Sequence, residues 1–312
     1  MLHLKREKRK LQNPKMKKNE LLEQFYKRRK SLINRVLIAT AILLILISVS
    51  LQFQKNESFV AKISIQGIIQ DRKDILDQLE QLNANENVKG LLIIINSPGG
   101  TYVASKEVHD LVKKISKKIP TAAYMREMAT SGGYLASLSS DKIFGNEGTI
   151  TGSVGVILQT ADISELLGKL GISPIIIKSG ELKAVPNPVE KIDDPKKKYL
   201  EDIIKTMQKE FLQLVKSRRN ISDNTLELVS DGRIFTGKQA KDLKLIDEVG
   251  SENDALNWLK EEAGVEDNIR IKDLSLQNDI SRIFNLSFLK KKINYFNQNF
   301  YNGFFAIWTP GV

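Results

Sequence analysis

A serine followed by two glycines, Ser131 in the run M-A-T-S-G-G-Y, is the residue best suited to nucleophilic chemistry. A serine hydroxyl attacks efficiently only when a base takes its proton. The chain has no cysteine and two histidines: His3 lies in a basic N-terminal segment and His109 in the helical pattern K-E-V-H-D-L-V. We therefore expect the base to be a lysine, and the best candidate is Lys183, 52 residues downstream in K-S-G-E-L-K-A-V-P-N-P.

The surroundings of this lysine must favour its neutral form, because only a neutral amine can accept a proton. Removal from water favours the neutral amine, and a nearby carboxylate favours the charged one. Leu182, Ala184 and Val185 beside Lys183 are apolar. Glu181 would favour the charged amine if it pointed inward, so we expect Glu181 to face solvent.

Acyl transfer also needs hydrogen-bond donors aimed at the oxyanion, and backbone N–H groups near glycine can supply them. Gly132, directly after the serine, is one candidate. The other lies in S-P-G-G, where Gly100 is our choice. A plain turn would explain S-P-G-G equally well, and the serine could instead be a helix cap.

Alternating strands and helices are expected to position these residues. The apolar run G-L-L-I-I-I-N is typical of a strand covered on both faces. The pattern predicts strands at 58–69, 90–96, 121–125, 142–144, 153–158 and 174–178, and helices at 71–82, 102–115, 195–218 and 253–263. This alternation predicts an α/β fold with a mainly parallel sheet. S-P-G-G then ends a strand at the carboxyl edge, where ligands of such sheets bind.

The N-terminal segment carries nearly all of the excess positive charge. Residues 1–35 hold 13 Lys and Arg against 3 Glu, which leaves 35 basic and 34 acidic residues for 36–312. Domains that bind nucleic acid usually carry their basic footprint within the fold. Nucleic acid is therefore not an expected partner.

An uncharged apolar stretch follows the basic segment directly. Residues 36–51 would span about 24 Å as a helix, and with their flanking residues they reach the length of a bilayer crossing. We interpret 36–53 as a transmembrane signal anchor in the inner (cytoplasmic) membrane, with residues 1–35 as a cytoplasmic tail and the rest outside the cytoplasm. A cleaved signal peptide and a buried core helix are the alternatives.

The C-terminal segment is rich in aromatic residues. The last 29 residues, 284–312, contain nine of the 21 aromatic side chains. We divide the rest of the chain into a main domain at 57–265 and a tail at 266–312. The tail could pack on the domain or in an oligomer contact, lie at a membrane surface, or occupy the chain's own ligand groove.

Four segments together, I-N-S-P-G-G, A-T-S-G-G-Y, T-G-S-V-G-V and K-S-G-E-L-K, resemble the signal peptide peptidase A family of serine-lysine membrane peptidases. The resemblance covers residues 57–265, including D-G-R-I-F-T-G-K-Q-A and L-I-D-E-V-G. It implies a fold like that of the Clp protease and crotonase superfamily. It also implies that Ser131 is the nucleophile, that Lys183 is the general base, and that Ser153 orients the lysine amine.

The pattern occurs once in the chain, as in the short form of this family. That form builds its sites in a ring of identical subunits and can draw the serine and the lysine from neighbouring chains. Two positions depart from the usual pattern. Ala184 follows the lysine where an acidic or small polar residue is more usual, and Asn187-Pro188 replaces a Ser-Pro.

The expected function is an endopeptidase that degrades signal peptides left in the membrane, with lipid around its anchor and with neither metal nor cofactor. A bound peptide is expected to add as a strand beside S-P-G-G, at Pro98 and Gly99. A Clp-type protease would need a Ser-His-Asp triad, and no histidine follows residue 109. A crotonase-type enzyme would be separated from coenzyme A, and a catalytically inactive membrane scaffold is the remaining alternative.

Overall fold

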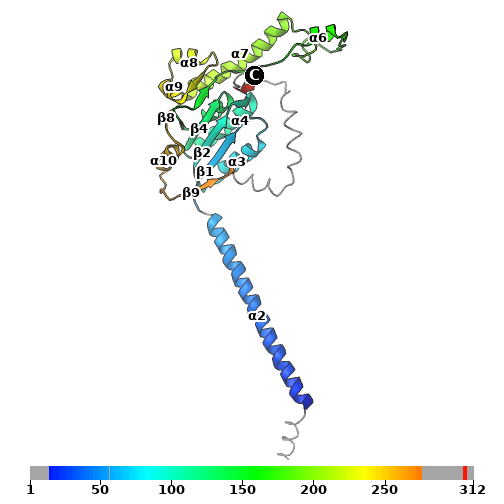
Figure 1. Cartoon of the computed structure of the whole chain (residues 1–312). Helices are drawn as coiled ribbons and strands as arrows, with labels where there is room; N and C mark the ends of the chain where they lie inside the picture. Colours follow the sequence, from blue (N-terminus) through cyan, green and yellow to red (C-terminus); the bar gives the residue numbers. More distant parts are fainter. Residues whose placement is uncertain (1–13, 56, 276–304, 308–312) are drawn as a thin grey trace, which may run out of the picture. The chain divides into compact units, whose positions relative to one another are not determined.

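The computed structural model describes residues 14–55, 57–275 and 305–307. The chain divides into two compact units, Met1–Glu57 and Ser58–Val312 (Figure 1). In the first unit the structure describes the long helix α2 (Pro14–Lys55), which includes the predicted anchor. Among the residues that the structure describes, no helix combines the length and the hydropathy of a membrane span. The anchor therefore stays a prediction, and residues 1–13 of the predicted cytoplasmic tail lie outside the described residues.

The second unit is built on a sheet that has eight strands within the described residues. The main path runs β7-β6-β4-β2-β1-β9; off this path, β5 pairs with the first half of β4, and β8 pairs with β5. Only β7 in this sheet pairs antiparallel, with β6. The strands are β1 (Phe59–Gln66), β2 (Val88–Ser97), β4 (Thr121–Thr130), β5 (Lys142–Gly145), β6 (Ile150–Gly152), β7 (Ile234–Thr236), β8 (Glu248–Val249) and β9 (Arg270–Asp273). The α/β fold with a mainly parallel sheet is thus confirmed.

Helices cover both faces of this sheet. Helices α3, α4 and α5 pack over one face, and α10 packs over the other (Figure 1). Helix α7 continues beyond the sheet, and three short helices lie in its connections. The helices are α3 (Lys73–Asn83), α4 (Tyr102–Ser116), α5 (Gly132–Ser137), α6 (Ser164–Lys169), α7 (Asp194–Arg218), α8 (Asp223–Val229), α9 (Gly237–Asp242) and α10 (Glu252–Glu262).

Strand β2 is buried on both faces, as its unbroken apolar run predicts. Leu91, Ile93 and Ile95 belong to the larger core under α3, α4 and α5. Leu92 and Ile94 belong to the smaller core under α10. Each of the five side chains is at most 1% exposed. The strand is therefore a rigid support for S-P-G-G at its carboxyl end.

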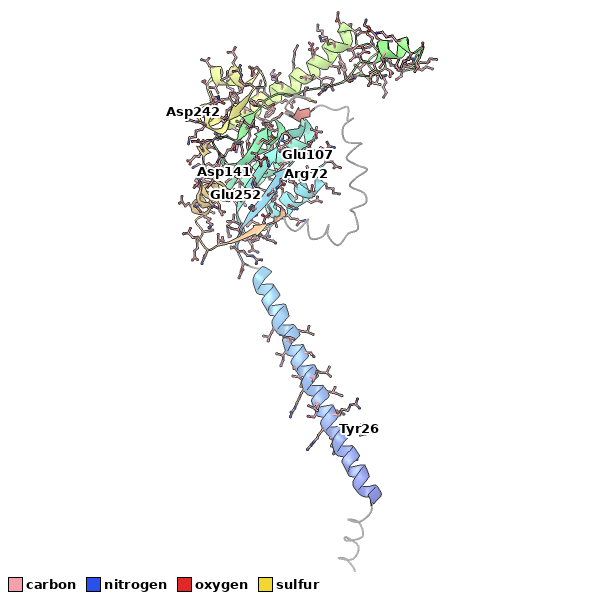
Figure 2. The ribbon with its side chains drawn as sticks, viewed as in Figure 1. Tyr26, Arg72, Glu107, Asp141, Asp242 and Glu252 are labelled. Atoms are coloured by element: carbon pink, nitrogen blue, oxygen red, sulfur yellow. The ribbon has the colours of Figure 1, made fainter. Side chains whose placement is uncertain are left out.

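An ion-pair cluster also holds α10 against the sheet. Glu252, labelled in Figure 2, accepts hydrogen bonds from Lys62 of β1 at 2.6 Å and from Arg126 of β4 at 3.2 Å. These contacts tie α10 to β4, the strand that ends beside Ser131.

Two expectations about the strands were wrong, and one strand lies beyond those expected. The strand predicted at 153–158 lies earlier, at Ile150–Gly152, because Ser153 turns the chain with a φ of +52°. Residues 174–178 form no strand, and Ile175 and Ile177 are 88% and 95% exposed, so nothing in the described part of the chain covers them. Strand β9 pairs with β1, so the sheet extends past residue 265, the expected end of the domain.

Residues 156–193, here called the arm, project from the domain. Figure 1 shows α6 and the segment around it beyond the N-terminal end of α7, away from the sheet. The C-terminal end of α7 is fixed to the domain by two arginines. Arg219 forms two 2.9 Å hydrogen bonds with Asp247. Arg218 donates to the carbonyls of Leu138, Ser139 and Ser140.

Candidate active site

Ser131 lies in a tight turn between β4 and α5. Its backbone N–H donates to the Gly152 carbonyl at 2.8 Å, and its φ is +53°, a region that residues other than glycine rarely adopt. Such a conformation costs about 1–3 kcal/mol and persists where the surrounding structure enforces it, often at functional sites. The Ser131 side chain does not cap α5; its hydroxyl lies 3.4 Å from the Gly155 carbonyl. Ser131 thus stands at the N-cap position of α5, as the helix-cap interpretation expected, but its hydroxyl makes no capping hydrogen bond.

The T-G-S-V-G loop runs beside Ser131. Ser153 is 8% exposed and also has a positive φ, +52°, and its N–H donates to the Arg233 carbonyl at 2.8 Å. Its neighbour Gly152 accepts the Ser131 N–H. The structure thus brings Ser131, Gly132 and Ser153 into one place, as the sequence predicted for the site.

The S-P-G-G segment joins the same site. The Ser97 hydroxyl donates to the Gly67 carbonyl at 2.6 Å and accepts the Gly99 N–H at 3.0 Å, which fixes the turn around Pro98. A Cβ atom on Gly133 would lie 2.9 Å from the Ser97 carbonyl oxygen, so the start of α5 packs directly against this segment.

The segment continues as a short strand, β3 (Gly99–Thr101), that is paired on both edges. On one edge Ile69 bridges to Gly100, accepting the Thr101 N–H and donating to the Gly99 carbonyl. A Cβ on Gly100 would lie 1.8 Å from the Ile69 oxygen, so this position requires glycine. Because backbone groups alternate along a strand, the N–H and C=O of Gly100 point to the opposite edge.

The C-terminal tail occupies that opposite edge. Strand β10 (Phe305–Ile307) pairs antiparallel with β3, and Ala306 lies opposite Gly100 (Figure 1, red arrow). Residues 305–307 of the tail therefore lie on the domain, at the strand edge predicted to bind an extended peptide. The other tail residues, 276–304 and 308–312, lie outside the described residues.

Lys183 lies apart from this constellation. Its side chain is exposed, as is that of Glu181, and its N–H donates to the Gly180 carbonyl at 3.0 Å within the arm. Within the described part of the chain, no hydrogen bond or ion pair joins Lys183 to Ser131 or Ser153. The desolvation expected for a catalytic lysine is thus not provided by the described part of a single chain.

The histidine alternative gains no support from the structure. His109 is buried on α4, and its Nδ1 lies 3.0 Å from the Asp110 carboxylate. Burial lowers the pKa of His109, and the adjacent carboxylate opposes that effect only in part. Among the described residues, no hydrogen bond connects this imidazole to Ser131.

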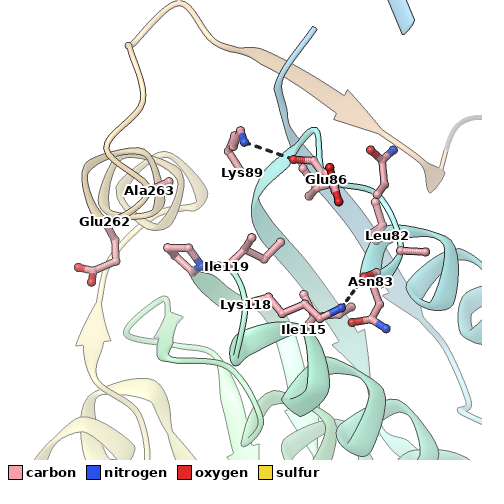
Figure 3. Close-up of a pocket in the computed structure, with 13 residues that line it drawn as sticks. Leu82, Asn83, Glu86, Lys89, Ile115, Lys118, Ile119, Glu262 and Ala263 are labelled. Atoms are coloured by element: carbon pink, nitrogen blue, oxygen red, sulfur yellow. Dashed lines mark hydrogen bonds between the residues drawn. The ribbon is translucent and has the colours of Figure 1, made fainter. Parts of the chain in front are cut away.

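A cavity of about 610 Å³ lies at the other end of the sheet (Figure 3). It is lined by Val88, where β2 begins, and by the ends of α3, α4 and α10. Two lysines of its lining donate hydrogen bonds to backbone carbonyls: Lys118 to Asn83 at 2.8 Å, and Lys89 to Glu86 at 3.2 Å. Ligands of parallel sheets bind at the carboxyl ends of strands, so the site around Ser131 is the better candidate.

Comparisons with known proteins identify the family of the chain. The model of peptidase family S49 matches residues 113–266, and that of the Clp protease family matches residues 57–144. A putative signal peptide peptidase SppA of Enterococcus faecium is 36% identical, over 67% of this chain and 64% of that protein. Putative proteases of Methanocaldococcus jannaschii and Synechocystis are 34% and 35% identical, over 62% and 66% of this chain and 63% and 75% of theirs. The chain thus spans less than two thirds of the first two relatives.

Proposed function

Since the chain belongs to peptidase family S49, we propose that it is a serine endopeptidase with Ser131 as nucleophile and Lys183 as general base. The observation that carries the proposal is the enforced turn at Ser131. That turn leaves the Ser131 hydroxyl without a capping bond to α5, next to Gly132, and the start of α5 packs against the segment that leads into the β3 edge.

The proposed reaction uses only groups of this protein. The Ser131 oxygen attacks the substrate carbonyl carbon, and the hydroxyl proton passes to the neutral Lys183 amine. The N–H groups of Gly132 and Gly100 stabilise the oxyanion. The lysine returns the proton to the leaving amine, and water then releases the acyl group by the same steps. Ser153 orients the lysine amine.

The proposed substrates are extended apolar peptides, among them cleaved signal peptides. An antiparallel strand on β3 can bind any sequence through its backbone, and side chains near its edges then select among sequences. Two exposed apolar residues flank this place: Ile68, beside Ile69, is 51% exposed, and Val103, just after β3, is 63% exposed. The tail residues that already occupy the edge are Phe305, Ala306 and Ile307, all apolar. Pro98 and Gly99, just before the paired part of β3, are proposed to contact the bound peptide.

The catalytic pair is proposed to form between two copies of the chain. The arm carries exposed apolar side chains at Ile157, Leu166, Leu170, Ile172, Ile175, Ile177 and Leu182. Apolar surface of this extent commonly marks a protein interface. Docking of the arm on a neighbouring subunit would remove Lys183 from water and bring it to the neighbour's serine. Repetition of the same contact closes a ring of identical subunits.

The helix α2 is proposed to anchor the enzyme through residues 36–53, with the basic N-terminus in the cytoplasm and the catalytic domain on the other side of the membrane. A tether of this kind would concentrate apolar peptides near the site. Protection of residues 58–312 from protease added to spheroplasts would contradict this orientation. Digestion of that domain, with residues 1–35 protected, is the expected result.

Hydrolysis of a fluorogenic apolar peptide by the full-length protein in detergent tests the proposal. Ser131→Ala and Lys183→Ala should each abolish turnover while the oligomer stays intact. When the two inactive variants are mixed during assembly, about a quarter of the sites receive both intact residues if they come from different chains. Activity near that fraction supports the shared site. Full activity of assembled Lys183→Ala would refute the dyad, and an inert wild type would favour a scaffold.

A further inference from the structure

The arm contains a cluster of polar side chains that closes the loop around Lys183. Lys178 Nζ lies 2.8 Å from Glu190 Oε2, although the two residues are 12 positions apart. The same carboxylate oxygen accepts a hydrogen bond from Asn187 Nδ2 at 3.3 Å. Lys178 Nζ also donates to the Glu181 carbonyl at 3.4 Å. We call the side chains of Lys178, Asn187 and Glu190 the clasp.

The clasp is well shielded for so exposed a segment. The Lys178 and Glu190 side chains are 14% and 24% exposed, whereas Ile175 and Ile177, just before the clasp, are 88% and 95% exposed. Hydrogen bonds to ionised groups are stronger than those between neutral groups, and partial shielding from water preserves them. The Lys178 hydrogen bond, against the opposing effect of desolvation, holds the pKa of the Glu190 carboxyl below its usual range. The Glu190 carboxylate is therefore ionised at neutral pH.

The clasp also distinguishes the two lysines of K-S-G-E-L-K. The Lys178 amine is held in an ion pair with the Glu190 carboxylate, so it is not free to act as the base at the catalytic serine. The Lys183 side chain has no polar partner in the described part of the chain. It stands between the two ends that the clasp joins, next to Ala184, whose φ is +63°. Its direction is thus set by the backbone of the closed loop.

We propose that Lys178, Glu190 and Asn187 are positioning residues that hold the loop at 178–190 in the shape that presents Lys183 to the catalytic serine. This inference rests on the proposed function. Ordering a flexible loop costs conformational entropy. The Lys178–Glu190 ion pair joins the two ends of the loop, so the loop is already ordered before the arm docks. Without the clasp the protein would still fold, but the Lys183 amine would lie within reach of the catalytic serine for a smaller fraction of the time. Asn187, which stands where the family more usually has the serine of Ser-Pro, is thus a member of the clasp.

Kinetics of full-length variants test the positioning role. Glu190→Gln and Lys178→Met should each lower kcat/KM by about tenfold, the size expected for one partly exposed charge-assisted hydrogen bond. The loss should appear in kcat rather than in KM, because β3 binds the peptide. The exchanged pair Lys178→Glu with Glu190→Lys should recover part of the loss. Lys142→Met is the matched control, since that lysine of β5 pairs with Glu248 at 2.8 Å and is 23% exposed outside the arm.

A second readout does not depend on activity. In a Ser131→Ala background, trypsin should cut after Lys183 several times faster when Glu190→Gln is added, and the control should cut at the parent rate. Unchanged kcat and unchanged cleavage in both clasp variants would overturn the inference. If Lys183→Ala itself keeps full activity, the proposed dyad fails instead, whatever the clasp variants do.

Discussion

The pairing of β10 with β3 predicts that the tail competes with substrate for one strand edge. Ala306→Pro is the sharpest perturbation, because proline lacks the N–H that would face Gly100 and fits poorly inside a paired strand. Ala306→Ser keeps that N–H and serves as the matched control. Both substitutions leave Ser131, Lys183 and the oxyanion glycines themselves unchanged.

The magnitude follows from the register of the pairing. Gly100 offers one N–H and one C=O to the residue opposite, and each such hydrogen bond contributes about 1 kcal/mol. A total of about 2 kcal/mol favours the occupied edge by roughly 30-fold. The apparent affinity for a competing peptide falls by the same factor. Ala306→Pro should therefore lower KM by about 10- to 30-fold and leave kcat within twofold.

The assay is the initial rate of fluorogenic peptide hydrolysis by full-length protein over a range of substrate concentrations. Ala306→Ser should give the wild-type KM. An unchanged KM in Ala306→Pro, or an equal fall in kcat, would show that β10 does not stand in the path of substrate. The reasoning about the β3 edge would then be refuted even if Ser131 proved to be the nucleophile.

Three further predictions concern single positions. Gly100→Ala should abolish turnover and lower the thermal unfolding midpoint, since its Cβ would meet the Ile69 oxygen at 1.8 Å; Gly148→Ala, with open space around it, should do neither. Ser153→Ala should reduce kcat by about tenfold or more and move the pH profile without changing the unfolding midpoint, and an unchanged profile would exclude its orienting role. The pKa of Glu190 in the folded protein is depressed, so the clasp should persist above the usual carboxyl pKa range and open as the pH falls through the depressed pKa. Hydrogen exchange of the loop at acidic pH measures this opening, and Glu190→Gln should show no such transition.

The sequence predicted best what depends on local pattern and on short spacing. The unbroken apolar run of β2 predicted a strand buried on both faces, and the glycines beside Ser131 and at Gly100 marked places where backbones approach closely. The position of β9 was missed because R-I-K-D is a short and polar edge strand without a clear period.

Other features depend on partners far away in the chain or outside it. The apolar residues at 174–178 look like a strand, but nothing in the described chain covers Ile175 or Ile177. The pairing of Ala306 with Gly100 joins segments about two hundred residues apart, so no local signal reports it. Residue type and spacing made Lys183 the candidate base, but the surroundings of its side chain could not be predicted, because the described chain does not supply them.

The firm attachment of α7 has a consequence for when the enzyme acts. Arg218 and Arg219 pin one end of a 25-residue helix, about 37 Å long, whose other end carries the arm. Under the proposed dyad, a newly made chain is a latent protease that holds one half of each of two sites. Turnover should then vanish on dilution below the assembly concentration. Proteolysis would be confined to places where enough copies have accumulated, and the cell would need no separate inhibitor for chains in transit.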